Sequence, residues 1–269
     1  MAERIFVSGA TGFIGARLVS RLVENGCTVH ALYRSESKAD ILREMEGVIL
    51  FKGDILDTES LQRAMKGCGR AFHAAAFASV WTRDPARVHD LNVNGSLNVI
   101  NAAAACGLLR VVITSTAGIL GPATDGPVNE DSPPPSSFFT PYETSKFALE
   151  EELKKLPGEA PEVVIVNPTR VYGPGLMSES NGVTRMIRRY LQGKWRLIPG
   201  KGQSMGNYVF VEDVVSGHLL AMEKGETGER YVLGGEDISY NRLFEICREL
   251  GNVNYMLFHV PLWLMLGVA

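Results

Sequence analysis

Cysteine is scarce in this chain of 269 residues, and its four copies, Cys27, Cys68, Cys106 and Cys247, lie far apart. Zinc sites and disulfide frameworks need cysteines at short or paired spacings, so we expect neither of them, and no other metal site, in this protein. Unpaired thiols are typical of a reducing compartment, which makes the cytoplasm the expected location.

Charge of one sign and long apolar runs are also missing. The 27 basic and 30 acidic residues give a net charge of −3, which does not favour binding to nucleic acid or to an anionic membrane. The first segment, "MAERIFVSGATGFIG", has no basic stretch before an apolar run, unlike a signal peptide. The last segment, "VPLWLMLGVA", is apolar but too short to cross a bilayer. Because the chain stops inside this apolar pattern, we expect a truncated C-terminus.

What the sequence does contain is an alternation of apolar runs and helical patterns over residues 1–168. Runs such as "CTVHALYR", "RVVITST" and "EVVIVNP" are separated by stretches long enough for helices. This pattern predicts a doubly wound α/β domain of the dinucleotide-binding type, with a parallel sheet covered on both faces. The rhythm then becomes irregular. We expect residues 169–269 to form mainly a smaller substrate-binding lobe, with 207–222 returning to the first domain.

Three glycines, Gly9, Gly12 and Gly15, follow the first expected strand and open the first helix in "VSGATGFIGARL". Glycines permit a tight turn and let a pyrophosphate approach the backbone, while the helix N-terminus offers unpaired N–H groups to phosphates. The position between a strand and a helix favours a dinucleotide-binding loop. An ordinary tight turn is the alternative.

The second strand bears on which dinucleotide would bind. A fold that binds NAD usually places an acid about 20 residues past the glycines, where it binds the ribose 2′-hydroxyl. The segment "VHALYRSES" has Tyr33 and Arg34 there, and no acid before Glu36. A guanidinium can bind a 2′-phosphate bidentately, so the sequence predicts NADP(H) in preference to NAD(H). Arg34 as a solvated residue at a strand end is the alternative.

The segment "FFTPYETSKFALEEEL" predicts a strongly capped helix, with Thr140 as the cap, Pro141 in the first position and Glu143 as the capping-box carboxylate. Tyr142 and Lys146 are four residues apart and therefore share one face of this helix. A nearby ammonium would lower the phenol's pKa from its usual value of about 10, so the pair predicts a proton donor or acceptor. A surface pair without chemistry is the alternative.

Hydroxyl groups that could polarise the same substrate oxygen end a nearby expected strand in "ITSTAG": Thr114, Ser115 and Thr116. A second Tyr–Lys pair, Tyr190 and Lys194, surrounds a glycine in "YLQGK". We interpret this second pair as the frayed end of a helix with an exposed lysine.

Nine motifs, taken together and in order, resemble the extended short-chain dehydrogenase/reductase family of the NAD-dependent epimerase/dehydratase type. They are "SGATGFIG", "GDILD", "FHAAA", "NVNGSLNVI", "TSTAG", "YETSK", "NPTRVYGPG", "NYVFVEDVVSGHLLAM" and "ERYVLGGEDIS". Within this family the chain is most similar to the dihydroflavonol-reductase-like and hopanoid-associated sugar-epimerase-like groups. The resemblance covers essentially the whole length. It implies a Rossmann-type fold, an NAD(P) cofactor, a small-molecule substrate and a homodimer.

The resemblance also implies roles for individual residues. Tyr142 would be the catalytic acid/base, Lys146 its tuner and a ribose ligand, and Thr116 the catalytic hydroxyl. Asn92 would help to order a proton-relay water, and Arg34 would select NADP. The other implied cofactor-binding positions are Gly9, Thr11, Gly12, Phe13, Ile14, Gly15, Asp54, Ile55, Ala74, Ala75, Ala76, Pro168 and Arg170.

These observations predict an NADP-dependent oxidoreductase that reduces a carbonyl to a secondary alcohol, with Tyr142 as the general acid. The substrate would lie against "FASVWTRD", "GPGLMSE" and the second lobe. Two alternatives stay open: a nucleotide-sugar epimerase or dehydratase that reoxidises its cofactor in each cycle, and a non-catalytic NAD(P)-binding redox sensor. His73, inside an apolar strand, is expected to be packed rather than reactive.

Overall fold

A parallel sheet forms the centre of the protein, as seen in a computed structural model that describes residues 2–79, 82–124, 126–156, 161–175, 177 and 180–261. In the described chain the sheet has seven strands in the spatial order β10-β6-β5-β4-β1-β2-β3. They are β1 (Arg4–Ser8), β2 (Thr28–Tyr33), β3 (Val48–Lys52), β4 (Arg70–His73), β5 (Arg110–Thr114), β6 (Glu162–Pro168) and β10 (Arg230–Leu233). The predicted doubly wound α/β fold is confirmed. The strand order reverses between β1 and β4, where such sheets bind ligands at their carboxyl ends.

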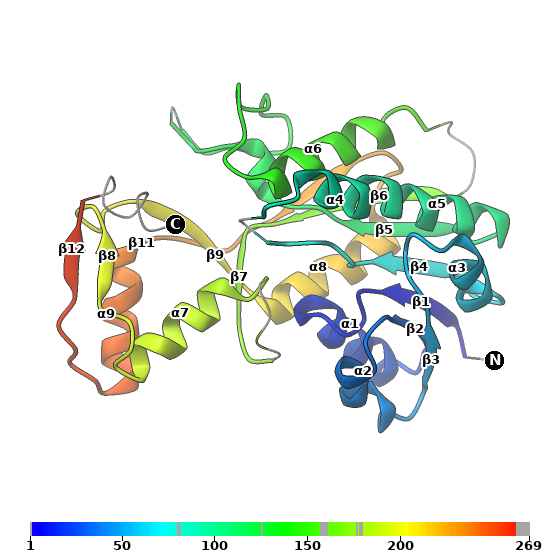
Figure 1. Ribbon diagram of the computed structural model, residues 1–269, viewed down its shortest axis with the longest axis horizontal. Coiled ribbons are helices and arrows are strands. Elements are labelled where there is room, and N and C mark those ends of the chain that lie inside the picture. Colours follow the sequence, from blue (N-terminus) through cyan, green and yellow to red (C-terminus); the bar gives the residue numbers. More distant parts are fainter. Residues whose placement is uncertain are drawn as a thin grey trace.

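Helices cover both faces of this sheet (Figure 1). One layer contains α1 (Phe13–Glu24), α2 (Glu36–Arg43) and α8 (Val211–Lys224), and the other contains α3 (Thr58–Met65), α5 (Gly95–Ala105) and α6 (Pro141–Leu153). Because side chains alternate along a strand, Ile5 and Val7 pack on the α1 side whereas Phe6 packs on the α3 side. The sheet is therefore apolar on both faces, as the near-continuous runs predicted.

The start of α6 follows the predicted pattern. The Thr140 hydroxyl accepts a hydrogen bond from the Glu143 N–H at 3.2 Å, and the Glu143 carboxylate accepts one from the Thr140 N–H at 3.0 Å. Pro141 occupies the first turn, where its missing N–H is not needed. The capping box is confirmed, and it fixes where Tyr142 leaves the helix.

The layer that carries α6 also contains a π-helical turn. α4 (Pro85–His89) continues through π-helical residues Asp90–Asn94 into α5. Such turns are frequent at functional sites, and this one carries Asn92.

The second lobe is made of smaller elements: β7 (Arg170–Tyr172), α7 (Gly182–Leu191), β8 (Leu197–Pro199), β9 (Met205–Phe210), β11 (Glu236–Ser239), α9 (Tyr240–Gly251) and β12 (Phe258–Val260). Its strands pair as β11-β9-β7 and β12-β8. The segment that returns to the first domain consists of α8 and β10, so it begins later and ends later than the expected 207–222. Residues 207–210 belong to β9.

Tyr190 is a core residue of the second lobe. It is completely buried, and its ring lies 4.9 Å from that of Phe244 and 6.1 Å from that of Tyr255. α7 does end at the next residue, and Lys194 is exposed. The expectation of a frayed end is nevertheless wrong for Tyr190, because tertiary packing holds the tyrosine in place.

None of the described helices has the length and apolar character needed to cross a membrane. Within the same residues no group of three or more histidine, cysteine, aspartate or glutamate side chains could hold a metal ion.

Candidate active site

The glycine loop connects β1 to α1 in direct contact with the loop after β4. Gly9 has a φ of +70°, and a Cβ there would lie 2.5 Å from the backbone of both Ala74 and Ala75. A Cβ on Gly15 would collide with the carbonyl oxygen of Gly9. Two of the three glycines are therefore required by the close packing of this turn.

Gly12 leaves the beginning of α1 open to a ligand. It is the N-cap residue and offers no side chain to the first N–H groups, and the first turn contains no acid. Thr11 and Ile14 are partly exposed beside it, whereas Phe13 is buried and offers only its backbone. Unpaired N–H groups and the helix dipole favour an anion at this position. The loop therefore fits the pyrophosphate of NAD(P).

Arg34 is the exposed cation at the end of β2. Its Nη1 lies 3.6 Å from the Asp54 carboxylate beyond β3, and two thirds of the side chain (66%) remain exposed. The first acid after Arg34 in the sequence, Glu36, accepts a hydrogen bond from Tyr33 at 3.2 Å and pairs with Lys52 at 3.0 Å. These contacts occupy Glu36 and leave the guanidinium of Arg34 accessible to a phosphate.

The other predicted cofactor positions lie mostly along the carboxyl edge of the sheet. Residues 74–76 follow β4 and are partly or fully exposed, and Pro168 is buried at the end of β6. Ile55 is buried. Arg170 does not join them: it lies on β7 with its guanidinium 5.7 Å from the centre of the Tyr208 ring.

Lys146 is a completely buried ammonium on α6. Its Nζ donates a hydrogen bond of 2.8 Å to the carbonyl oxygen of Thr114, at the end of β5. Burial lowers the pKa of Lys146 from 10.5 to about 8, while the nearby Glu150 charge acts in the opposite direction. The ammonium has donors to spare for a ligand, since no other described residue accepts from it.

Tyr142 is half-buried, and its hydroxyl makes no hydrogen bond to any residue that the structure describes. Burial raises the pKa of Tyr142 from 10 to about 12, and the Glu143 charge adds to this rise. The predicted lowering by Lys146 is wrong for the chain by itself, because loss of hydration dominates and the ammonium is directed to Thr114. Tyr142 is therefore a protonated phenol at neutral pH.

Thr116 begins a short 3-10 helix, Ala117–Leu120. Its Oγ1 accepts a hydrogen bond of 3.1 Å from the N–H of Gly118, so the hydroxyl proton is left to donate elsewhere. Thr116 is partly exposed, whereas Ser115 is buried, with a hydroxyl that no described residue pairs. The more accessible of the two hydroxyls is therefore that of Thr116.

Asn92 connects the loop after β4 to α6. Its Oδ1 accepts from the N–H of Phe77 at 2.8 Å, and its Nδ2 donates to the Phe77 carbonyl at 3.2 Å and to the Ser145 hydroxyl at 2.8 Å. Both amide hydrogens are thus used within the protein. The predicted water-ordering role of Asn92 stays a prediction. The observed side-chain contacts hold the loop after β4 against α6.

His73 is buried between two serines, which confirms the expectation of a packed histidine. The Ser96 hydroxyl donates to the Asn92 carbonyl at 2.6 Å, so it accepts from His73 Nε2 at 2.8 Å. His73 Nδ1 then accepts from Ser8 at 2.6 Å. Burial, with the charge of Lys146, lowers the pKa of His73 from 6.5 to about 3. The ring is therefore neutral and connects β4 to β1 and to the start of α5.

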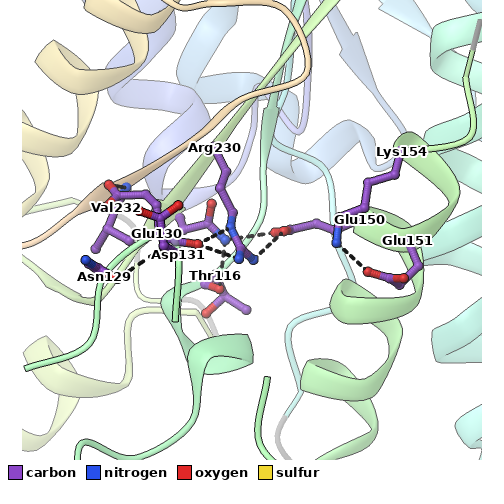
Figure 2. Close-up of polar contacts among 10 residues, drawn as sticks. Thr116, Asn129, Glu130, Asp131, Glu150, Glu151, Lys154, Arg230 and Val232 are labelled. Atoms are coloured by element: carbon purple, nitrogen blue, oxygen red, sulfur yellow. Dashed lines mark hydrogen bonds and ion pairs between the residues drawn. The ribbon is translucent and has the colours of Figure 1, made fainter. Parts of the chain in front are cut away.

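A buried polar network behind Thr116 was missed by sequence reasoning (Figure 2). Asn167 on β6 donates to the Thr116 carbonyl at 3.1 Å and to the Glu150 carboxylate at 2.8 Å. Arg230 on β10 lies 3.3 Å from the same carboxylate. The one signal for this network in the sequence was Glu150, which lies four residues after Lys146 and therefore on the same face of the helix.

The predicted substrate loops lie partly outside the described residues. Trp81 of "SVWTRDP" is among these positions, as are Leu176, Ser178 and Glu179 of "GPGLMSE" and the last segment, 262–269.

Comparison with known proteins agrees with this geometry. The model of the NAD dependent epimerase/dehydratase family matches residues 5–234. The chain belongs to this family. The match confirms the resemblance carried by the nine motifs, and the chain is an NAD(P)-dependent enzyme of the extended short-chain dehydrogenase/reductase type with a Rossmann-like fold.

Relatives within the family have different activities. The chain is 34% identical over 267 residues to sterol demethylase protein B of Methylococcus capsulatus, covering 98% of this chain and 79% of that protein. It is 36% identical over 246 residues to cinnamoyl-CoA reductase 1 of Petunia hybrida, covering 85% and 71%. The crystal structure of UDP-glucose 4-epimerase with UDP-glucose from Thermotoga maritima matches with a TM-score of 0.85 at 29% identity, covering 96% and 85%. Reductases and epimerases thus both occur among the relatives.

Proposed function

We propose that the protein is an NADP-dependent oxidoreductase that reduces a carbonyl to a secondary alcohol. The observation that carries this proposal is the Lys146 ammonium, which is completely buried and has one hydrogen bond, to Thr114, among the described residues. A buried charge is unfavourable unless its polar contacts are completed. The ribose hydroxyls of a bound dinucleotide are suitable partners for the remaining donors.

The residues around Lys146 suit reduction. Bound NADPH would supply a hydride to the carbonyl carbon. Tyr142, protonated because its pKa is about 12, would donate its proton to the carbonyl oxygen. Thr116, whose side-chain oxygen already accepts from Gly118, would donate a hydrogen bond to the same substrate oxygen and keep its own proton.

The preference for NADP rests on the residues after β2. Arg34 is largely exposed beside the Asp54 carboxylate, and Glu36 is occupied by Tyr33 and Lys52, so the guanidinium is available to the adenosine ribose. A guanidinium favours a 2′-phosphate through charge-assisted hydrogen bonds.

Net reduction is supported by the similarity to a cinnamoyl-CoA reductase over most of the chain. The second candidate is a redox-neutral nucleotide-sugar epimerase, and the structural match to a UDP-glucose 4-epimerase favours it. The residues described above can serve either reaction, because both need a hydride acceptor or donor and a positioned phenol. The ratio of cofactor consumed to product formed separates the two candidates, because only net reduction consumes NADPH.

The test measures cofactor consumption together with products. The purified protein is incubated with NADPH and dihydroquercetin, which carries a ketone, and in parallel with NAD⁺ or NADP⁺ and UDP-glucose. We expect NADPH to disappear in equal amount with a reduced product. Conversion of UDP-glucose to an epimer without net change in the cofactor would contradict the proposal and assign the second function.

A further inference from the structure

We propose that Glu150 is a positioning residue for Thr116. Its carboxylate, held by Arg230, orients the Asn167 amide. That amide in turn holds the Thr116 carbonyl, which fixes the direction of the Thr116 hydroxyl (Figure 2). The inference rests on the proposed function, in which that hydroxyl donates to the substrate oxygen. It assigns a role to three residues from α6, β6 and β10 that do not themselves contact the substrate.

The orientation of Asn167 is decided by its two acceptors. The side chain is completely buried, and Nδ2 donates both of the hydrogen bonds that it makes to described residues, one to the Thr116 carbonyl and one to Glu150. Its Oδ1 has no partner among the described residues. Rotating the amide by half a turn would place that oxygen against two other acceptors. The carboxylate of Glu150 therefore selects the orientation that holds Thr116.

Glu150 is in turn held from the other side. Its side chain is 2% exposed, so the carboxylate needs a fixed cation, and Arg230 Nη1 lies 3.3 Å away. The same guanidinium donates from Nε and Nη2 to the carbonyl of Glu130, at 2.9 and 2.5 Å. The Glu130 carboxylate accepts from the Val232 N–H at 2.7 Å, which ties this loop to β10. Arg230 therefore has little freedom to move away from Glu150.

Thr116 is fixed at both of its polar ends. Asn167 holds its carbonyl, and the N–H of Gly118 holds its side-chain oxygen at 3.1 Å. The same carbonyl also accepts from the N–H of Ile119 at 3.4 Å. Without the shorter bond from Asn167, only this contact among the described residues would hold the peptide between 116 and 117, and the direction of the hydroxyl would be less fixed. Glu150 also lies one helical turn beyond Lys146 and raises the pKa of that lysine against the effect of burial. One carboxylate thus supports two groups of the candidate site.

The first test reads the position of Thr116 without any substrate. The amide proton of Gly118 donates to Thr116 Oγ1, so its NMR chemical shift reports on that contact. We expect Glu150→Gln and Asn167→Leu to move or broaden this resonance. Glu151→Gln is the matched control, since Glu151 pairs with Lys154 on the exposed side of the same helix. An unchanged Gly118 resonance in folded Glu150→Gln would overturn the inference.

The second test asks whether Glu150 acts through Thr116 in turnover. With dihydroquercetin as the probe, Glu150→Gln should lower kcat about tenfold with KM little changed. In a Thr116→Ala background the same substitution should lower kcat less than about twofold. Equal losses in both backgrounds, with a lowered melting temperature, would make Glu150 merely structural. Normal turnover in Thr116→Ala would instead refute the role of the Thr116 hydroxyl and with it this inference. The absence of any NADPH-dependent reduction by the unmodified protein would count against the proposed function, and the Gly118 resonance would then still decide whether Glu150 positions Thr116.

Discussion

The Lys146 ammonium donates a hydrogen bond of 2.8 Å to the carbonyl oxygen of Thr114, which ties α6 to the carboxyl end of β5. This contact places a completely buried charge at the edge where doubly wound sheets bind ligands. Burial works against the charge, and the pKa of Lys146 falls from 10.5 to about 8. A residue placed so unfavourably for folding is better explained by ligand binding than by stability.

Lys146→Met should separate these two roles. The pKa difference between 10.5 and about 8 corresponds to roughly 3 kcal/mol against the charged form, a cost that is fully present below pH 8. Removing the charge should therefore leave the melting temperature at pH 7 unchanged or higher. Affinity for NADPH, measured by titration, should fall at least about tenfold, because a charge-assisted donor to the ribose is lost.

Lys154→Met is the matched control for this prediction, since Lys154 is exposed on the same helix and pairs with Glu151. It should change neither the melting temperature nor the affinity for NADPH. A large loss of stability in Lys146→Met, with cofactor affinity retained, would assign the lysine a structural role.

Arg34→Ala should reduce the preference for NADPH over NADH. A charge-assisted hydrogen bond to the 2′-phosphate is worth about 1.5–3 kcal/mol, so NADPH affinity should fall by roughly 10- to 150-fold while NADH affinity changes little. Titration of both cofactors into both proteins measures this. Arg43→Ala is a useful control, because Arg43 is engaged with Asp40 and Glu36. An equal loss of affinity for both cofactors would show that Arg34 does not bind the 2′-phosphate.

Two buried histidines should make the fold sensitive to acid. Burial lowers the pKa of His73 to about 3 and that of His218 to about 4, from 6.5 in each case. Between pH 6.5 and 4 the unfolded chain therefore binds protons that the folded protein does not. The free energy of unfolding should fall as pH falls through this window, by up to about 1.4 kcal/mol per pH unit for each histidine.

Replacing one histidine tests this assignment. His218 accepts from the Thr114 hydroxyl at 2.8 Å and donates to the Val214 carbonyl at 2.7 Å, and His218→Gln keeps polar groups for both. The free energy of unfolding, measured with denaturant from pH 7.5 to 4.5, should depend less steeply on pH in this variant, by the equivalent of about one bound proton. An unchanged slope would mean that His218 is not held neutral by the fold.

The features that the sequence predicted well are local. The capping box of α6 involves contacts within four residues, and spacing alone reveals it. The glycine loop was recognisable for the same reason, although its contact with Ala74 was not.

What the sequence could not predict depends on tertiary contacts. Asn167 and Arg230 reach Glu150 from strands 17 and 80 residues away in the chain, and no spacing rule connects them. Tyr190 has the sequence signals of a helix end, but its burial comes from α9 and the following loop. The pKa of Tyr142 was predicted in the wrong direction because spacing shows which charge is near and not how much water is lost.

The rate of NADPH oxidation by Tyr142→Phe, relative to Tyr190→Phe, tests the central claim most directly. Each substitution removes one phenolic oxygen and keeps the ring. The Tyr190 hydroxyl is buried without a partner among the described residues, so its removal should leave folding and turnover unchanged or improved. Tyr142→Phe should remain folded, because the capping box is untouched, and turnover should drop about 10²- to 10⁴-fold, the usual contribution of a positioned acid or base. Near-normal turnover in a folded Tyr142→Phe protein would contradict the account.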